Sequence, residues 1–354
     1  MVSSRILDAG AVNEALSRLS MRRREWKYLD HFNARTIDDA VFLLNRYREE
    51  AKIIAGGVDL VGLLKNKLRT PRVLVNIKTI PELAYITEDA EGLKIGALTT
   101  IKDIESSAIT REKYRILVAA AHSVGSPLVR NMATIAGNLC QDVRCWYYRR
   151  SPASGLTFCC RRKGGERCFA ADGENQFHAI FNGNECHSVC PSDMAPALLA
   201  LQARVKIASP PGERVVPLEE FYMPLGNILE PDEIITEVQV PAPKPGTNQR
   251  YLKFRIRKAI DFAISSVAVV ITAAAGIVTE ARVVLGGVAP VPYRAFSAEE
   301  ILSGRTIAEG IAETAAKAVV SEAVPLSQNA YKVPITESLI KRAVLLSLPL
   351  PLLS

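Results

Sequence analysis

The order of apolar and polar residues between positions 36 and 77 predicts alternating helices and strands. After Thr36, apolar side chains recur at positions 40, 41, 43, 44 and 47, which places them on one face of a helix. Thr36 and Asp39 have the spacing of a capping box, with Asp in place of the usual Glu or Gln. Apolar stretches at 53–60 and 73–77 lie on either side of a helical segment at 63–67. This order of elements predicts an α/β unit.

A second unit of the same kind starts near Tyr85. Strands are predicted at 93–98 and 204–208, and helices at 113–122 and 195–201. Between them lie a turn at 134–141 and a long polar stretch that carries most of the cysteines. We therefore expect two α/β subdomains that together occupy residues 28–228.

From about residue 229 the pattern changes to strands followed by helices. Strands are predicted at 234–240, 251–257, 267–275 and 281–285, and helices at 307–323 and 337–348. The segment 251–257 alternates between apolar and basic residues, as a strand with two different faces does. Separate runs of strands and helices are typical of an α+β domain, which we place at 229–354.

Composition limits the class of protein. The 354 residues are 48% hydrophobic and 23% charged, which is typical of a globular protein with two or three domains. The longest apolar run, 267–278, is too short to span a bilayer, so we expect no membrane span. The net charge of +7 comes without a basic helix bearing interleaved aromatic residues, so we expect no nucleic-acid partner.

The start of the chain lacks the pattern of a secretory signal. Residues 1–27 carry charged side chains where a signal would have an apolar core. We interpret them as an N-terminal extension and expect a cytoplasmic protein, or a periplasmic one if a partner subunit carries the export signal.

Two glycine-containing loops are candidates for binding a large cofactor. The paired glycines of Ala55–Leu60 permit positive φ and remove side chains that would block a phosphate, and successive N–H groups in such a turn can bind an anion. In Thr134–Leu139, Thr134 and Asn138 are candidate donors to a phosphate or to a flavin ring. Either loop alone is typical of an ordinary turn, whereas two loops about 80 residues apart favour one extended ligand. Neither has the G-x-G-x-x-G pattern of a Rossmann nicotinamide site.

Six of the seven cysteines lie in a basic stretch between residues 145 and 190, namely Cys145, Cys159, Cys160, Cys168, Cys186 and Cys190. Four interpretations are open: buried inert thiols, disulfides, a structural zinc site or an iron–sulfur cluster. The odd total and the missing signal disfavour disulfides, and only 186–190 approaches the spacing of a zinc knuckle. Four thiolates at irregular spacing suit an iron–sulfur cluster. A long irregular loop is uncommon unless it is functional, which favours the cluster.

Several motifs together resemble the flavin-binding subunit of the xanthine dehydrogenase family of molybdenum hydroxylases. They are 55–60, 81–83, 130–141 and 286–295, together with Tyr251, Arg257, Asp261 and Phe262. The cysteine stretch is similar to the branch of that family whose flavin subunit also carries a [4Fe-4S] cluster, such as three-subunit aldehyde oxidoreductases and 4-hydroxybenzoyl-CoA reductase. The resemblance covers nearly the whole chain from about residue 28.

The resemblance implies a fold, two cofactors and their ligands. The fold would be a vanillyl-alcohol-oxidase-type (PCMH-like) FAD-binding domain of two subdomains at 28–228, with the cluster loop at about 143–190, followed by the α+β domain. The residues implied to bind FAD are Ile54, Ala55, Gly56, Gly57, Val58, Asp59 and Leu60 at the pyrophosphate, Thr134, Gly137, Asn138 and Gln141 in the second loop, and Asp193 at the flavin. The implied ligands of the [4Fe-4S] cluster are Cys145, Cys160, Cys168 and Cys186, with Cys159 as the competitor of Cys160.

The function implied by the resemblance is electron transfer. A large partner would hold the molybdenum cofactor, a small partner with [2Fe-2S] clusters would deliver electrons to FAD in this chain, and an external acceptor would remove them. We therefore expect an oxidoreductase subunit without a general acid or base of its own. The sequence departs from the family at Val58, where a polar residue is usual, and at Ala136, where Gly is common. A self-contained FAD oxidase and a zinc-binding scaffold or nucleic-acid module are the alternatives.

Overall fold

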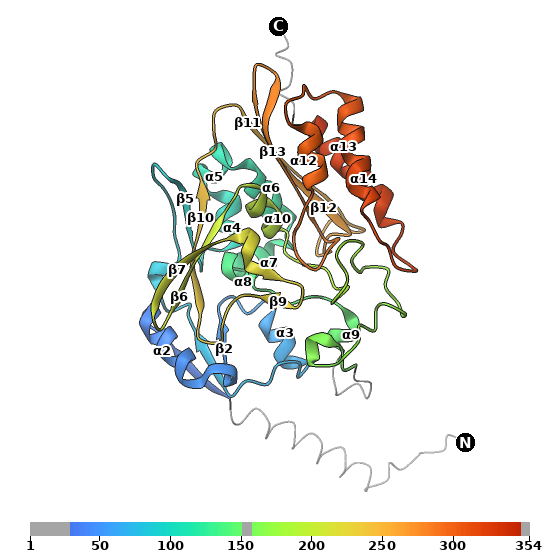
Figure 1. Cartoon of the computed structure of the whole chain (residues 1–354). Coiled ribbons are helices and arrows are strands. Elements are labelled where there is room, and N and C mark those ends of the chain that lie inside the picture. Colours follow the sequence, from blue (N-terminus) through green and yellow to red (C-terminus); the bar gives the residue numbers. More distant parts are fainter. Residues whose placement is uncertain (1–28, 151–157, 348–354) are drawn as a thin grey trace, which may run out of the picture.

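The computed structural model describes residues 29–150 and 158–347 and contains three main sheets, each covered by helices (Figure 1). The predicted N-terminal extension lies outside the described residues. No helix within the described ranges is long and apolar enough to cross a membrane.

The first sheet is parallel and has three strands in the order β1-β3-β2. Its strands are β1 (Asp30–Asn33), β2 (Ala51–Ile54) and β3 (Val73–Asn76), and its helices are α2 (Ile37–Tyr47) and α3 (Leu60–Lys65). Helix α2 begins with the predicted capping box, because the Thr36 hydroxyl accepts from the Asp39 N–H and the Asp39 carboxylate accepts from the Thr36 N–H. The predicted order of helix, strand, turn, helix and strand is confirmed.

The second sheet has five strands in the order β4-β5-β10-β6-β7. They are β4 (Ile86–Glu88), β5 (Gly92–Gly96), β6 (Arg204–Ser209), β7 (Gly212–Pro217) and β10 (Ile234–Pro241). The sequence pattern places the strand 234–240 in the C-terminal domain, but in the structure β10 pairs with β5 and β6 and lies in the middle of this sheet. A proline-containing connector follows β10 and leads to the next sheet.

Short helices fill the chain between β5 and β6 and pack with that sheet into the largest buried apolar cluster. They are α4 (Ile101–Ser106), α5 (Ala108–Lys113), α6 (Arg115–Ser123), α7 (Pro127–Met132), α8 (Ile135–Leu139) and α10 (Met194–Ala200). Helix α9 (Trp146–Arg149) lies between the same two strands in sequence, but its Tyr148 packs in a separate small cluster with Val143 and Cys160. Helix α11 (Leu218–Phe221) and a two-strand hairpin, β8 (Tyr222–Met223) and β9 (Gly226–Asn227), follow β7. The helix predicted at 113–122 is interrupted at buried Tyr114, which separates α5 from α6.

The third sheet is antiparallel, in the order β11-β12-β13-β14. Its strands are β11 (Thr247–Phe254), β12 (Ser265–Ala274), β13 (Ile277–Gly286) and β14 (Tyr293–Arg294), and its helices are α12 (Phe296–Leu302), α13 (Glu309–Ser321) and α14 (Lys332–Leu345). These helices cover one face, while α6 and α10 contact the other (Figure 1). Because both faces are covered, β12 is apolar at every position from Val267 to Ile271.

The alternating segment 251–257 does not behave as a simple amphipathic strand. The side chains of Tyr251 and Lys253 are both buried, and Tyr251 belongs to the apolar cluster of the second sheet and its helices. Leu252 packs against the helices on the opposite face, whereas Phe254 and Ile256 are 43% and 71% exposed. The strand face that carries Lys253 is therefore buried. The Lys253 ammonium is tolerated there because it pairs with the buried carboxylate of Asp193.

Candidate functional site

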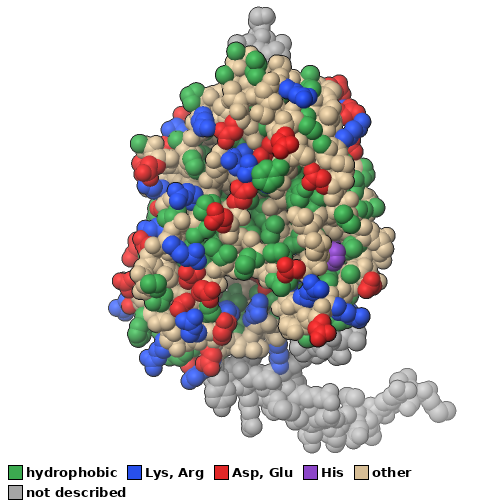
Figure 2. All heavy atoms as spheres, in the orientation of Figure 1, with side chains coloured by type: hydrophobic (Ala, Val, Ile, Leu, Met, Phe, Trp, Pro, Cys, Tyr) green, Lys and Arg blue, Asp and Glu red, His purple; other side chains and the backbone are tan. Residues whose placement is uncertain are grey.

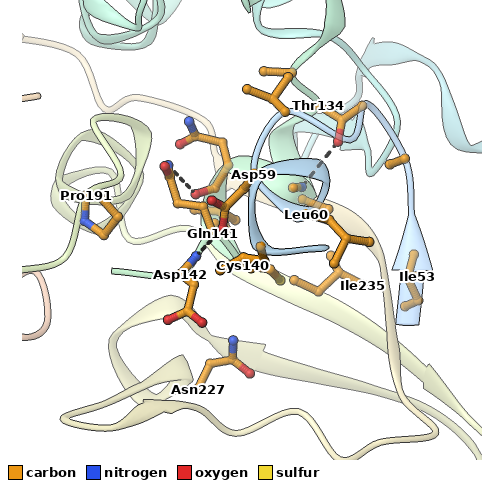
Figure 3. A pocket seen from close by; sticks show the side chains of 18 of the residues that line it. Ile53, Asp59, Leu60, Thr134, Cys140, Gln141, Asp142, Pro191, Asn227 and Ile235 are labelled. Atoms are coloured by element: carbon orange, nitrogen blue, oxygen red, sulfur yellow. Dashed lines mark hydrogen bonds between the residues drawn. The ribbon is translucent and has the colours of Figure 1, made fainter. Parts of the chain in front are cut away.

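The two glycine loops form neighbouring walls of one cavity of about 760 Å³. This cavity opens as a hollow on the face seen in Figure 2, and Figure 3 shows its side chains from close by. Its volume lies within the range of cofactor sites. The predicted residues that line it are Ala55, Gly56, Gly57, Val58, Asp59, Leu60, Thr134, Gly137, Asn138, Gln141 and Asp193.

Ile54 is the predicted cofactor residue that does not line the cavity. It ends β2, and its Cδ1 lies 3.6 Å from the position that a Cβ of Gly57 would take. Its side chain therefore supports the turn from the protein side. The neighbouring Ile53 lines the cavity instead, since successive side chains of a strand point to opposite faces.

The first loop is shaped by its two glycines. Gly57 has φ of +70°, which side chains rarely adopt. A Cβ on Gly56 would lie 1.7 Å from the Met132 carbonyl oxygen, so the loop packs backbone against backbone on the end of α7. The loop that follows β2 is thereby pressed against the segment that leads into the second loop.

The second loop is helix α8 with the residues before and after it. Thr134 caps the helix by accepting from the Gly137 N–H at 3.2 Å. Asn138 is buried and accepts from the Ser192 hydroxyl at 2.6 Å, and Gln141 donates to the Asn138 carbonyl at 2.9 Å. These contacts fix the loop and join it to the segment that carries Asp193.

Asp59 connects the first loop to the beginning of the cysteine stretch. Its carboxylate accepts from Arg144 at 2.5 Å, from Arg149 at 2.8 Å and from the Asp142 N–H at 2.7 Å (Figure 3 shows the last contact). Burial lowers the pKa of Arg144, and Asp59 opposes that change. The carboxylate thus pairs with two arginines at the edge of the cavity and offsets one of their two charges.

Asp193 is held at the cavity by a buried ion pair that the sequence did not reveal. The Asp193 carboxylate accepts from Lys253 Nζ at 2.7 Å and from the Tyr251 hydroxyl at 2.9 Å. Burial raises the pKa of Asp193, and Lys253 opposes the rise. The only sequence signal for Lys253 was its place in an alternating strand, which did not show that its face was buried.

The four predicted cluster ligands gather around a second, smaller cavity. Cys145, Cys160, Cys168 and Cys186 all line it, although they come from separate parts of the loop. Cys159 is exposed and does not line it, while Cys160 is buried. The structure thus brings together the set that includes Cys160.

The remaining cysteines lie elsewhere. Cys140 and Cys190 line the large cavity, and all seven cysteines are free thiols. Among the described residues, no group of three or more His, Cys, Asp or Glu side chains is arranged to hold a metal ion. The small cavity measures about 10 Å³, so the four sulfur atoms would have to move apart around a cluster.

Three polar side chains contact the sulfur atoms of this cavity. His178 Nε2 lies 3.2 Å from Cys145 Sγ, Ser188 Oγ lies 3.0 Å from Cys186 Sγ, and Arg162 Nε donates to Cys186 Sγ at 3.4 Å. Burial is the main cause that raises the pKa of the Cys145 thiol to about 12; backbone hydrogen bonds from Tyr148 and Tyr147 oppose the rise. Without a bound metal, this thiol therefore stays protonated at neutral pH. A bound metal ion would stabilise the thiolate, because metal ligation deprotonates a thiol.

Aromatic side chains hold the cysteine loop in place of regular secondary structure. Phe158 packs edge to face on Tyr147 and on Phe169, each with ring centroids 5.0 Å apart. Trp146 packs in the same way on His178 at 5.3 Å, and Arg167 lies over the Phe169 ring. Such pairs stabilise by about 0.5–1.5 kcal/mol each beyond the area they bury. The loop is therefore a packed structure around the four thiols.

Comparison with known proteins gives a consistent result over both parts of the chain. Residues 27–243 match the model of the FAD binding domain in molybdopterin dehydrogenase, and residues 250–347 match that of the CO dehydrogenase flavoprotein C-terminal domain. The chain is 35% identical over 290 residues to the aldehyde oxidoreductase FAD-binding subunit PaoB of Escherichia coli K12, covering 80% of this chain and 86% of that one. It is 28% identical over 316 residues to the carbon monoxide dehydrogenase medium chain of Hydrogenophaga pseudoflava, covering 88% and 93%.

A solved structure shares the fold. It is the carbon monoxide dehydrogenase from Hydrogenophaga pseudoflava that lacks the Mo-pyranopterin moiety of the molybdenum cofactor. The TM-score is 0.73 at 26% identity, and the match covers 90% of this chain and 96% of that chain. The similarity extends over both the α/β part and the C-terminal part.

Proposed function

The chain belongs to the family of FAD-binding subunits of molybdopterin dehydrogenases, and from this premise we propose that it binds FAD in the large cavity and a [4Fe-4S] cluster at the four gathered cysteines. As such a subunit it is part of an oxidoreductase and transfers electrons. The substrate is hydroxylated in a large partner that holds the molybdenum cofactor. A small partner with [2Fe-2S] clusters delivers the electrons, and an external acceptor removes them.

One observation carries the FAD proposal: loops about 80 residues apart in sequence wall a single cavity, and Gly56 of the first packs backbone against backbone on Met132, just ahead of the second. A side chain at Gly56 would collide with the Met132 carbonyl, so the turn keeps its N–H groups uncovered by side chains. We propose that residues 55–60 hold the pyrophosphate of FAD, and that Thr134, Gly137, Asn138 and Gln141 face the flavin end. FAD supplies the electron-transfer chemistry when it is bound.

Asp193 and its partners would set the environment of the flavin. The carboxylate is buried at the cavity wall, and its charge is compensated by Lys253 and Tyr251. The pair therefore presents an oriented carboxylate without a net buried charge. We propose that it orients the flavin, and we assign no proton transfer to it.

The cluster proposal rests on the donor set. Four thiols from three separate stretches line one cavity, which is the ligand number that a [4Fe-4S] cluster requires. Arg162 donates to one of the sulfur atoms and so offsets the negative charge of a thiolate-ligated cluster. Cys145, Cys160, Cys168 and Cys186 would hold the cluster, which when bound supplies one-electron chemistry. Cys159 is excluded from this set because it is exposed and outside the cavity.

We also propose that the α/β part has the vanillyl-alcohol-oxidase-type (PCMH-like) arrangement. The support is a small parallel sheet and a larger antiparallel sheet, with a cofactor-sized cavity walled by the loop after β2 and by the segment around α8. The connector after β10 is the natural division from the C-terminal α+β domain, since β11 starts the next sheet.

The visible spectrum of the anaerobically purified chain, with iron and sulfide assays, tests both cofactors. Flavin bands and about four irons per chain are expected for one Cys-ligated cubane. Cys168→Ser should lose the iron, whereas Cys190→Ser should keep it because Cys190 lines the other cavity. Zinc without flavin would contradict the proposal, and substrate turnover by the purified chain alone would favour a self-contained oxidase.

A further inference from the structure

Arg162 lies in the wall between the two cavities. It lines the large cavity together with the hairpin β8–β9, and it lines the cysteine cavity together with Cys186. Its side chain is only 7% exposed. A guanidinium buried in this position is unusual, because burial of a charge is costly unless the charge is paired and hydrogen-bonded.

Each nitrogen of the Arg162 guanidinium has a partner. Nε donates to Cys186 Sγ at 3.4 Å, Nη2 donates to the Pro224 carbonyl at 2.8 Å, and Nη1 donates to the Leu225 carbonyl at 3.1 Å. Nη1 also lies 3.6 Å from a carboxylate oxygen of Asp142. The guanidinium therefore joins a sulfur atom of the cysteine cavity to the turn of the hairpin that borders the large cavity.

The acidic partner of Arg162 is itself fixed between the two cavities. Asp142 lines the large cavity, and its carboxylate accepts from the Tyr148 hydroxyl, a residue of the cysteine cavity. In Figure 3 the Asp142 carboxylate points toward the hairpin that carries Asn227. The contacts of Arg162 and Asp142 thus form one hydrogen-bonded connection between the two sites.

We propose that Arg162 is a positioning residue that raises the reduction potential of the cysteine-bound cluster and at the same time holds the β8–β9 hairpin against the FAD cavity. This inference rests on the proposed cluster. A reduced cluster carries one more negative charge than an oxidised one, so a fixed cation and a hydrogen bond to a ligand sulfur stabilise the reduced state. The planar fork of arginine makes the sulfur and carbonyl contacts together, which a lysine cannot do.

Two substitutions separate the two effects, and a neighbour serves as control. Arg162→Gln removes the charge and the fork, whereas Arg162→Lys keeps the charge and removes the fork. Arg161→Gln is the matched control: Arg161 lies in the same short helix η5 (Arg161–Lys163) and also lines the cysteine cavity, but it is exposed and donates to the carbonyls of Glu166 and Asn184 instead of to a sulfur atom. All variants are made in the full chain purified without partner subunits, so that the EPR signal comes from the cluster of this chain alone.

The first readout is the potential of the cluster, measured by redox titration followed by EPR. Arg162→Gln should shift the equilibrium about tenfold toward the oxidised cluster, which is about 59 mV for a one-electron couple. Arg162→Lys should shift it less, and so should Arg161→Gln, because Arg161 is exposed and donates to backbone carbonyls instead of to a ligand sulfur. The second readout is the dissociation constant of FAD, which should rise in both Arg162 variants because the hairpin loses its two carbonyl contacts.

The outcomes distinguish this inference from the proposal on which it rests. A wild-type chain without iron would overturn both. A wild-type chain with a cluster, and potentials that move equally in Arg162→Gln and Arg161→Gln, would overturn the role of Arg162 alone. If Arg162→Gln does not retain its cluster, Arg162→Lys decides: weaker FAD binding with a retained cluster supports the inference, and wild-type values of both readouts reject it.

Discussion

Substitution of Gly56 by Ala tests the cofactor loop most sharply. The new Cβ would lie 1.7 Å from the Met132 carbonyl oxygen and 2.7 Å from its carbonyl carbon, whereas ordinary contacts begin at 3.4 Å. The contact must therefore open from 1.7 Å to 3.4 Å, which is a displacement of about 1.7 Å between two backbone segments. Neither segment can avoid the clash by rotating a side chain.

The expected loss follows from this displacement. Overpacking of this kind typically costs about 1–3 kcal/mol of stability. If the shift breaks two backbone hydrogen bonds to the pyrophosphate, each worth about 1.5 kcal/mol, FAD should bind about a hundredfold more weakly. Titration of the deflavinated chain with FAD measures the affinity, and urea unfolding without FAD measures the stability separately.

Gly62 provides the matched control on the neighbouring helix α3. No atom lies within 4 Å of the position that its Cβ would take. Gly62→Ala should therefore leave FAD affinity unchanged and stabilise the helix by about 0.5–1 kcal/mol. Wild-type affinity in Gly56→Ala, or an equal loss in both variants, would show that the contact with Met132 does not shape the cofactor site.

Three further changes test separate contacts. Lys253→Met leaves the Asp193 carboxylate buried without its cation, so urea unfolding should show that the free energy of unfolding falls by about 3–5 kcal/mol. Adding Asp193→Asn should restore part of this loss, and an unchanged free energy in Lys253→Met would contradict the ion pair. Burial lowers the pKa of Lys332 from 10.5 to about 7, so between these values the unfolded chain binds more protons than the folded chain. Stability should therefore rise with pH across that window by up to about 1.4 kcal/mol per pH unit, and Lys332→Met should remove this rise from denaturant curves; equal pH slopes would refute the assignment. Cys160→Ser should lose its iron while Cys159→Ser keeps it, measured as iron per chain, and the reverse result would make Cys159 the ligand.

Local patterns in the sequence predicted most elements of the fold. The capping box at Thr36 and Asp39 marks the start of α2 in the structure, because its contacts span only three residues. The assignment of β10 to the C-terminal domain was wrong. In the structure β10 pairs with β6 and with β5, and β5 lies more than a hundred positions earlier in the sequence. A strand's own residues specify its faces and not its neighbours.

The same distinction applies to the site. The cysteines were visible because six of them in one polar stretch are unusual, and the glycine loops were visible because two of them occur about 80 residues apart. Lys253 and Arg162 were not, because a basic residue in sequence is normally exposed, and only the fold shows that these two are buried against Asp193 and Cys186. Ile54 was included because the family motif was read as a continuous run, whereas side chains of a strand alternate.

The most direct test of the account is an electron-density map of the anaerobically purified chain, with anomalous scattering measured at the iron edge. The account predicts FAD along the loops 55–60 and 134–141, and an iron peak surrounded by Cys145, Cys160, Cys168 and Cys186. A map with four protonated thiols around a metal-free cavity, or with a nucleotide outside the large cavity, would contradict it.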